Sequence, residues 1–474
     1  MSSSSRSYFS LALAGFAAIL FAVVLFAPQL LGDGDTYWHL AVGAWIISHA
    51  QIPRGDIFSY TMAGHPWIAQ EWLSEVAMAA AFRVAGWAGL MILFASATGG
   101  AVILLGTHLR RWIEPLPLLL AMLMALSVIS PSLIARPHLL VLPVMEIWCA
   151  GLVIAREQGR APPVWLLPLM VLWTNMHGSF PAGLVLVGLL SCEAAAADIR
   201  QAGPWFGFTF ASIASTLLNP YGIDGALFPL RLINSGALTK IDEWQATDFN
   251  QNPPIAEVLG LILYLGLVRG FTLPPWRFLI FVGLLYASLL HFRNQMLVGI
   301  IGLPVIAPSL GRFFGVQRAP AVGEARRSGL IFFVAAAALS LLRLVHPLVR
   351  GDDSVTPQTA LAHVPLSLRA MPVFNDDAFG GYLIFAGVKP FIDGRADLYG
   401  SEFNERYYRS MTLPGSLFAD QLTRYQVRWA VVSPTSPAIT AFSALPAWRC
   451  LYRGKTAVVY VLRQDATPLP AGRE

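Results

Sequence analysis

The stretch that decides the fold is Gly32–Val76, which reads GDGDTYWHLAVGAWIISHAQIPRGDIFSYTMAGHPWIAQEWLSEV. It follows an apolar N-terminal run and contains five acids, two prolines and four tryptophans. Most of the sequence after it consists of apolar runs with the composition of membrane-spanning helices. We therefore expect the chemistry of the protein to be located in this stretch.

The composition is that of a polytopic membrane protein. Only 12% of the 474 residues are charged and 56% are hydrophobic, whereas about 25% of the residues of a soluble domain are charged. The mean hydropathy is +0.59. A net charge of +5 fits basic cytoplasmic loops, so no nucleic-acid partner is expected. Three cysteines do not make a disulfide framework.

About eleven membrane-spanning helices are expected. The first apolar run, Tyr8–Leu31, exceeds the roughly 7–15 residues of a signal-peptide core, so it is interpreted as a transmembrane helix. The other ten are predicted near Trp87–Leu109, Leu116–Ser130, Leu139–Ile154, Val164–Trp173, Ala182–Ala197, Phe206–Leu218, Ala256–Leu267, Phe278–Leu290, Met296–Leu310 and Leu330–Val345. These spans are almost entirely apolar at their centres.

The basic residues favour a cytoplasmic N-terminus and a C-terminus on the outer face of the membrane. With this orientation the outer connections hold few basic residues. The inner connections then contain Arg110, Arg111, Arg156, Arg160, Arg200, Arg269, Arg277, Arg312, Arg318, Arg326 and Arg327. The first outer loop, residues 32–86, and the C-terminal region would both lie on the outer face.

The first outer loop is expected to contain two helices. Asp35 or Thr36 can cap the first, which ends near Ser48. The second carries Glu71 and Glu75 one turn apart.

Residues 1–347 are predicted to form the transmembrane domain, and residues 348–474 a small periplasmic α/β domain. The C-terminal region alternates short β-rich runs with turns and polar helices. A helix is expected at Leu417–Tyr425. The expected strands are Met371–Phe374, Tyr382–Phe385, Pro390–Ile392, Arg428–Val432 and Ala457–Leu462.

Asp33 and Asp35 are the candidate catalytic residues, at the point where the first helix leaves the membrane. A carboxylate here could deprotonate an acceptor hydroxyl, or two could hold a divalent cation. The same residues also suit helix capping and a turn at the membrane surface. The pattern alone leaves these alternatives open.

Several other polar residues are predicted near the same outer surface. Ionisable groups at helix ends often line a cavity, although each could also anchor a helix at the interface. Arginine and histidine at such ends could bind a lipid-linked phosphate. The candidate substrate-binding residues are Arg136, His138, His177, Arg293, His39 and Glu71. Asp242 and Glu243 are possible acceptor-side acids, and Asp376-Asp377 and Asp393–Asp397 fit either ligand-binding loops or ordinary turns.

With these residues in view, the chain resembles the GT-C superfamily of membrane glycosyltransferases. It is similar above all to bacterial relatives of the protein mannosyltransferases and the lipid A aminoarabinose transferases. The resemblance rests on the acidic motif that opens the first outer loop, the pattern WHL…G.WI…IP..D.FS.T…G.PWI..EWL.EV in residues 38–76, and the segments FNDDAFGGYLIF and FIDGRADLYG.

The resemblance implies a mainly α membrane fold with an outer C-terminal α/β domain. It also implies transfer of a sugar from a polyprenyl-phosphate donor to a polysaccharide, lipid or protein acceptor at the outer face. The general base would be Asp35 or Asp33, and Glu71 or Asp56 could be a second acid. Metal use differs within the superfamily, so a divalent cation is possible and no other cofactor is implied.

Two alternatives remain open at this point. One is a non-catalytic transporter of lipid-linked saccharides or a cell-envelope polysaccharide assembly protein. A transporter should carry polar residues at mid-membrane, which the apolar spans do not favour. The other is a polysaccharide polymerase or ligase, which uses the same donor but keeps its main acceptor loop later in the chain.

Overall fold

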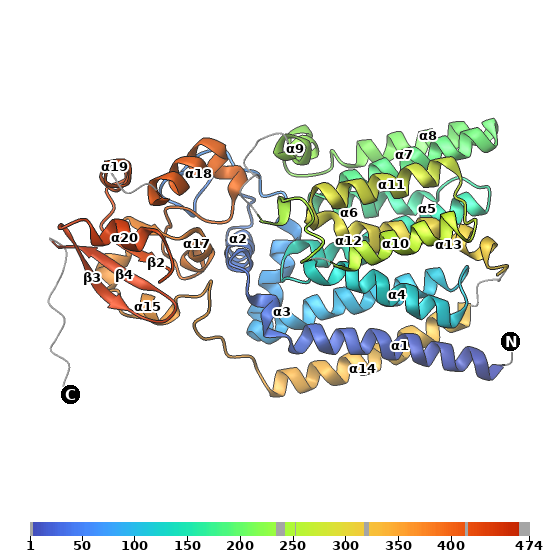
Figure 1. The fold of residues 1–474 in the computed structure, drawn as a ribbon, viewed down its shortest axis with the longest axis horizontal. Coiled ribbons are helices and arrows are strands. Elements are labelled where there is room, and N and C mark those ends of the chain that lie inside the picture. Colours follow the sequence, from blue (N-terminus) through green and yellow to red (C-terminus); the bar gives the residue numbers. More distant parts are fainter. Residues whose placement is uncertain (1–2, 234–241, 252, 317–321, 413–415, 464–474) are drawn as a thin grey trace.

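The computed structural model describes residues 3–233, 242–251, 253–316, 322–412 and 416–463. A long bundle of helices forms one part, and a smaller α/β unit is attached to one end of it (Figure 1). Helix α2 lies between the two parts, and the N-terminus lies at the opposite end of the bundle (Figure 1).

The bundle contains helices that match all eleven predicted spans. Seven helices of the described residues are long and apolar enough to cross a membrane, and three shorter apolar helices accompany them. The number of actual crossings stays a prediction. The helices are α1 Ser3–Phe26, α2 Asp35–His49, α3 Trp72–Leu109, α4 Pro115–Ile129, α5 Pro137–Glu157, α6 Leu167–Met176, α7 Phe180–Ala197, α8 Ala202–Ser215, α9 Ile223–Ile233, α10 Pro253–Leu267, α11 Pro275–Leu290, α12 Gln295–Leu297, α13 Leu303–Phe313 and α14 Val322–Val345.

One of the apolar helices carries a buried acid near its centre. Glu146, near the middle of α5, is fully buried, and neither of its carboxyl oxygens has a hydrogen-bond partner among the described residues. Around it, α5 packs into a core of large side chains that includes Trp148 and Trp173. Glu146 is thus an exception among the almost entirely apolar span centres.

The first outer loop folds back onto the end of the bundle. Its second helix is the start of α3, which breaks at Ala85 and Gly86, where Gly86 has a φ of 56°. The predicted span that starts at Trp87 follows this break directly. The first helix, α2, was expected to be capped by Asp35 or Thr36. Instead Gly34 is the cap residue and Asp35 is the first residue of the helix.

The C-terminal unit consists of the elements from α15 to β4. Its helices are α15 Gln358–Ala362, α16 Leu366–Arg369, α17 Asp377–Phe385, α18 Ala396–Thr412, α19 Ser416–Arg424 and α20 Ala438–Ser443. Its strands are β1 Val373–Asn375, β2 Trp429–Val432, β3 Trp448–Arg453 and β4 Val458–Leu462.

The four strands form one mixed sheet in the order β1-β2-β4-β3, with β1 parallel to β2 and the other pairs antiparallel. Successive side chains of a strand point to opposite faces of the sheet, and here helices bury both faces. In β2, Ala430 and Val432 face the core formed with α18, α19 and α20. Trp429 and Val431 face the core formed with α15, α16 and α17. The predicted small α/β region is therefore confirmed.

Two of the expected strands are wrong. Tyr382–Phe385 belongs to helix α17, and Pro390–Ile392 is not a strand. Residues 382–385 have the composition of a strand, and the preceding Gly380 and Gly381 have low helix propensity. A Cβ atom on Gly380 would lie 2.3 Å from the Ile392 carbonyl oxygen, so close packing accounts for this glycine. Strand β3 was not predicted.

Candidate active site

The two acids that open the first outer loop have different roles in the structure. Asp33 Oδ1 accepts a hydrogen bond of 2.9 Å from the backbone N–H of Asp35. This contact satisfies one of the free donors at the start of α2, as a capping side chain does. The Asp35 side chain makes no such capping bond and lies toward Arg136. Of the two carboxylates, Asp33 supports the start of α2, whereas Asp35 is directed to Arg136.

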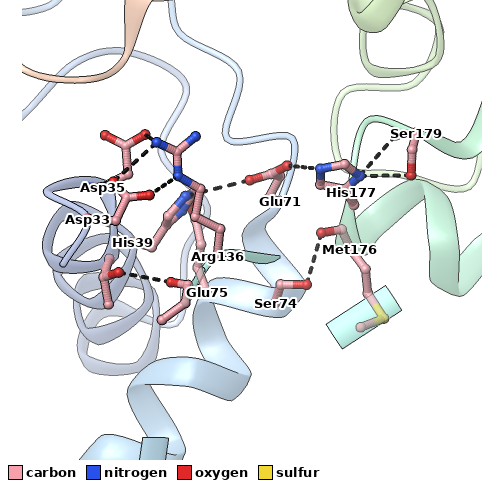
Figure 2. Close-up of polar contacts among 12 residues, drawn as sticks. Asp33, Asp35, His39, Glu71, Ser74, Glu75, Arg136, Met176, His177 and Ser179 are labelled. Carbon is pink, nitrogen blue, oxygen red and sulfur yellow. Dashed lines mark hydrogen bonds and ion pairs between the residues drawn. The ribbon is translucent and has the colours of Figure 1, made fainter. Parts of the chain in front are cut away.

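Arg136, the residue just before α5, contacts both acids. Its guanidinium donates two hydrogen bonds to the Asp33 carboxylate and lies 2.9 Å from Asp35 Oδ2 (Figure 2). Pro137 restricts Arg136 to the extended conformation that it adopts, with φ −123° and ψ 162°. This conformation ends the preceding turn, and α5 begins at the proline.

Glu243 links Arg136 to a second arginine. Arg136 Nη1 and Arg293 Nη1 each lie 3.0 Å from the Glu243 carboxylate. Arg293 also packs over the Trp244 ring, with its Cζ atom 4.5 Å from the ring centroid. One carboxylate thus bridges two guanidinium groups that come from distant parts of the chain. We call Asp33, Asp35, Arg136, Glu243 and Arg293 the arginine group.

A second set of polar side chains lies beside the arginine group. Glu71, just before α3, faces His39 Nε2 at 3.7 Å and His177 Nε2 at 3.3 Å (Figure 2). His39 Nδ1 lies 3.0 Å from Glu75 Oε1. His177 Nδ1 accepts a hydrogen bond from the Ser179 backbone N–H, which leaves Nε2 to donate toward Glu71. We call His39, Glu71, Glu75 and His177 the histidine group.

Burial gives the acids unusual proton affinities. Burial raises the pKa of Asp35 to about 7, and the nearby Asp33 carboxylate adds to this rise against the lowering effect of Arg136. Burial likewise raises the pKa of Glu71 to about 8 although Arg293 and Arg136 oppose the change. A carboxylate whose pKa is near neutral can take up a proton from a substrate and release it again at physiological pH.

The two groups differ in charge near pH 7. Burial lowers the pKa of both His39 and His177 well below the usual value, so these rings are neutral. Burial opposes ionisation of Glu243, but Arg136 and Arg293 outweigh it and hold the pKa of this carboxyl below its usual value. The two arginines of the arginine group are thus already paired with carboxylates, and an anionic ligand would have to displace one of these, such as Glu243. The histidine group offers neutral hydrogen-bonding partners.

Seven of the eight residues predicted from the sequence belong to the arginine group or the histidine group. The exception is His138, whose Nε2 donates a 2.6 Å hydrogen bond to the Ser132 carbonyl, so it holds the turn before α5. Its ring is still close to His177, with 6.0 Å between the ring centroids. Asp56, a possible second acid, lies elsewhere in a fully buried ion pair with Arg395. Glu71 is the acid that accompanies Asp35.

Sequence reasoning did not place Glu75 in the site and gave Glu243 only as a possible acceptor-side acid. The one-turn spacing from Glu71 was a usable signal for Glu75, whereas nothing local marks Glu243 as a partner of two arginines. Among the described residues, no group of three or more histidine, cysteine, aspartate or glutamate side chains has the arrangement of a metal site.

No sequence-family model matches the chain, and no curated protein matches its sequence. Solved structures do match its fold. The oligosaccharyltransferase of Archaeoglobus fulgidus in its apo form is 12% identical with a TM-score of 0.53, covering 90% of this chain and 69% of that one. ArnT from Cupriavidus metallidurans bound to undecaprenyl phosphate is 11% identical with a TM-score of 0.53, covering 97% and 99%. The apo state of ArnT is 12% identical with the same TM-score, covering 98% and 100%.

Identities this low show the fold alone. The chain therefore shares the fold of an oligosaccharyltransferase and of ArnT, and the predicted GT-C-like fold class, mainly α with a small mixed sheet near the C-terminus, is confirmed. The number of spans stays a prediction.

Proposed function

We propose that the protein is a glycosyltransferase that moves a sugar from a polyprenyl-phosphate donor to an acceptor at the outer face of the bacterial inner membrane. The observation that carries the proposal is the arginine group, in which Asp35 pairs with Arg136, and Arg136 shares the Glu243 carboxylate with Arg293. Its place supports the proposal, because it lies between the helical bundle and the C-terminal unit in a GT-C-like fold. The ArnT neighbour was solved with undecaprenyl phosphate.

The donor phosphate would bind Arg136 and Arg293. Guanidinium groups bind phosphate oxygens through charge-assisted hydrogen bonds, and the Glu243 carboxylate shows that one anion can contact both arginines at 3.0 Å. The phosphate would replace Glu243 there. The same arginines would stabilise the negative charge that stays on the phosphate when the sugar leaves.

Asp35 would act as the general base. It would accept the proton of the acceptor hydroxyl while the acceptor oxygen forms a bond to the sugar carbon and the bond from that carbon to the phosphate oxygen breaks. The products are the glycosylated acceptor, polyprenyl phosphate and a protonated Asp35, which then releases its proton to solvent. Glu71, His39 and His177 would hydrogen-bond the sugar or acceptor as neutral groups.

The orientation completes the proposal. The N-terminus would be cytoplasmic, the C-terminus periplasmic, and residues 348–474 would form a periplasmic domain after a transmembrane domain of residues 1–347. The donor would enter from the bilayer and the acceptor from the aqueous side.

Substitution of Asp35 tests the chemistry. Protein in nanodiscs is incubated with undecaprenyl-phosphate-linked sugars and lipids extracted from bacterial membranes, and the release of undecaprenyl phosphate is measured. General base catalysis contributes about 10²–10⁴-fold in rate, so Asp35→Asn should be slowed at least about 100-fold. Its melting temperature should stay unchanged, because Asp33 and not Asp35 makes the capping bond.

Asp33→Asn is the matched control. Asparagine caps helices about as well as aspartate, so this variant should keep its stability and lose less activity than Asp35→Asn. If both variants release undecaprenyl phosphate at the parent rate, the acids serve only the fold and the proposed mechanism is wrong.

A further inference from the structure

The C-terminal unit comes into direct contact with Asp35 at one glycine. A Cβ atom on Gly394 would lie 1.8 Å from Asp35 Oδ1 and 2.8 Å from its Cγ. The φ angle of Gly394 is not positive, so its backbone conformation does not require glycine. A side chain here would meet the Asp35 carboxylate, which would have to move to admit it. Gly394 itself is exposed to solvent.

The segment that carries Gly394 is firmly attached to the first outer loop. Arg395 has no exposed side-chain surface and lies 2.8 Å from Asp56 Oδ1 and 2.7 Å from Asp393 Oδ1. Tyr399 donates a 2.8 Å hydrogen bond to Asp393 Oδ2. The Arg395 guanidinium also lies 4.8 Å from the centre of the Trp67 ring. A buried charge with this set of partners has little freedom to move.

A second close approach fixes the start of α2 against the same unit. A Cβ atom on Gly381 would lie 2.0 Å from the Gly34 carbonyl oxygen, and a Cβ atom on Gly34 would lie 2.6 Å from the Ala378 carbonyl oxygen. Backbone therefore packs on backbone immediately before Asp35. Contacts of this kind hold Asp35 and Gly394 in a fixed relative position.

The end of the segment also faces the site. Asp397 Oδ2 accepts a 3.1 Å hydrogen bond from Trp67 Nε1. Its charge is close enough to Glu71 to contribute to the raised pKa of that residue, after the effects of burial, the arginines and Asp35. The segment Asp393–Asp397 thus extends from Asp35 toward Glu71.

We propose that residues 393–397 form one wall of the active site and that Gly394 determines access to Asp35. The inference rests on the proposed role of Asp35 as the general base. The acceptor reaches the carboxylate across the exposed surface of Gly394, and any side chain at this position fills the approach. The active site is then incomplete without the C-terminal unit.

Chemical labelling tests this access without a known substrate. The full-length protein is treated near pH 6 with a water-soluble carbodiimide and a small amine, which together convert accessible protonated carboxyl groups to amides, and labelled peptides are identified by mass spectrometry. Asp35 should be labelled in the parent protein and lose its label in Gly394→Val. Gly394→Ala adds a single methyl group and should reduce labelling as well.

Gly351→Val is the matched control. Gly351 is also exposed, its φ is not positive, and a Cβ atom there would meet no atom within 4 Å. This variant should keep the Asp35 label of the parent. Equal labelling of Asp35 in the parent, Gly394→Ala and Gly394→Val, at unchanged melting temperatures, would overturn the inference.

A second readout separates this inference from the proposed function. Both Gly394 variants should bind undecaprenyl phosphate as the parent does, because Arg136 and Arg293 are not altered. In the release assay they should lose activity. If the parent shows no release activity at all, the proposed function fails while the labelling still decides whether Gly394 controls access to Asp35.

Discussion

Glu243→Gln should increase the affinity for undecaprenyl phosphate. The Glu243 carboxylate contacts Arg136 and Arg293 at 3.0 Å each, so a phosphate has to displace it from both arginines. Glutamine has nearly the same volume and can still accept a hydrogen bond, but it carries no charge. The variant therefore removes an internal competitor of the phosphate without emptying the site.

The size of the effect follows from the geometry. A hydrogen bond to a charged group contributes about 1.5–3 kcal/mol. The side chains of Glu243 and Arg293 are 20% and 30% exposed, so solvent weakens their contact. The lower end for one bond, about 1.5 kcal/mol, is therefore the appropriate value. Since about 1.4 kcal/mol corresponds to a tenfold change, Kd should fall about tenfold.

Tryptophan fluorescence gives a direct assay, because Trp244 packs on Arg293 and should respond when phosphate replaces Glu243. The protein is titrated with undecaprenyl phosphate in detergent at constant salt. Asp224→Asn is the matched control, since it removes the same charge from an exposed ion pair with Arg231. Its Kd should stay at the parent value. An unchanged or higher Kd in Glu243→Gln would refute the idea that this carboxylate occupies the phosphate position.

Three further predictions concern stability and orientation. Glu71 has a pKa of about 8 in the folded protein, against an ordinary value of 4.5, so the unfolded state binds fewer protons between these pH values. The free energy of unfolding should therefore fall as pH rises from about 4.5 to 8. Chemical denaturation should show a smaller fall in Glu71→Gln than in the parent protein. Arg395→Met leaves Asp56 and Asp393 buried without their cation, so it should lower the free energy of unfolding by about 3–5 kcal/mol in chemical denaturation. Adding Asp56→Asn to this variant should restore part of the loss. A reporter that fluoresces only in the cytoplasm should be dark when fused to the C-terminus and bright when fused after Gly315, and the reverse result would place the site on the cytoplasmic side.

The sequence was sufficient to predict the helical bundle because long apolar runs have few other structural solutions in a membrane. It was less informative in the C-terminal region, where local propensity and tertiary contacts disagree. The run GGYLIF has the composition of a strand, yet it lies in helix α17, where backbone from other segments packs against Gly380 and Gly381. Such a contact is made by residues far away in the chain, so no local pattern reveals it.

Some residues of the candidate site could be predicted from the sequence and others could not. Asp33, Asp35 and Arg136 could be predicted because each lies where a helix leaves or enters the apolar part of the bundle, and polar groups at such positions are exceptional. Glu243 has no comparable signal, because its partners Arg136 and Arg293 are 107 and 50 residues away along the chain. The sequence indicates which end of the bundle carries polar groups, but not which of them form pairs.

The separate roles of Asp33 and Asp35 show why geometry had to decide between them. In the sequence, Asp33 and Asp35 have the same charge, share Gly34 as a neighbour and have the same capping ability. Once α2 begins at Asp35, Asp33 is placed to accept the Asp35 N–H, and its capping role limits its use as a base. Asp35 is then left between Arg136 and Gly394: one carboxylate oxygen lies 2.9 Å from the Arg136 guanidinium and the other lies against Gly394, which is exposed to solvent. The proposed mechanism places the general base between donor and acceptor, and of the two acids Asp35 fits that position better than Asp33.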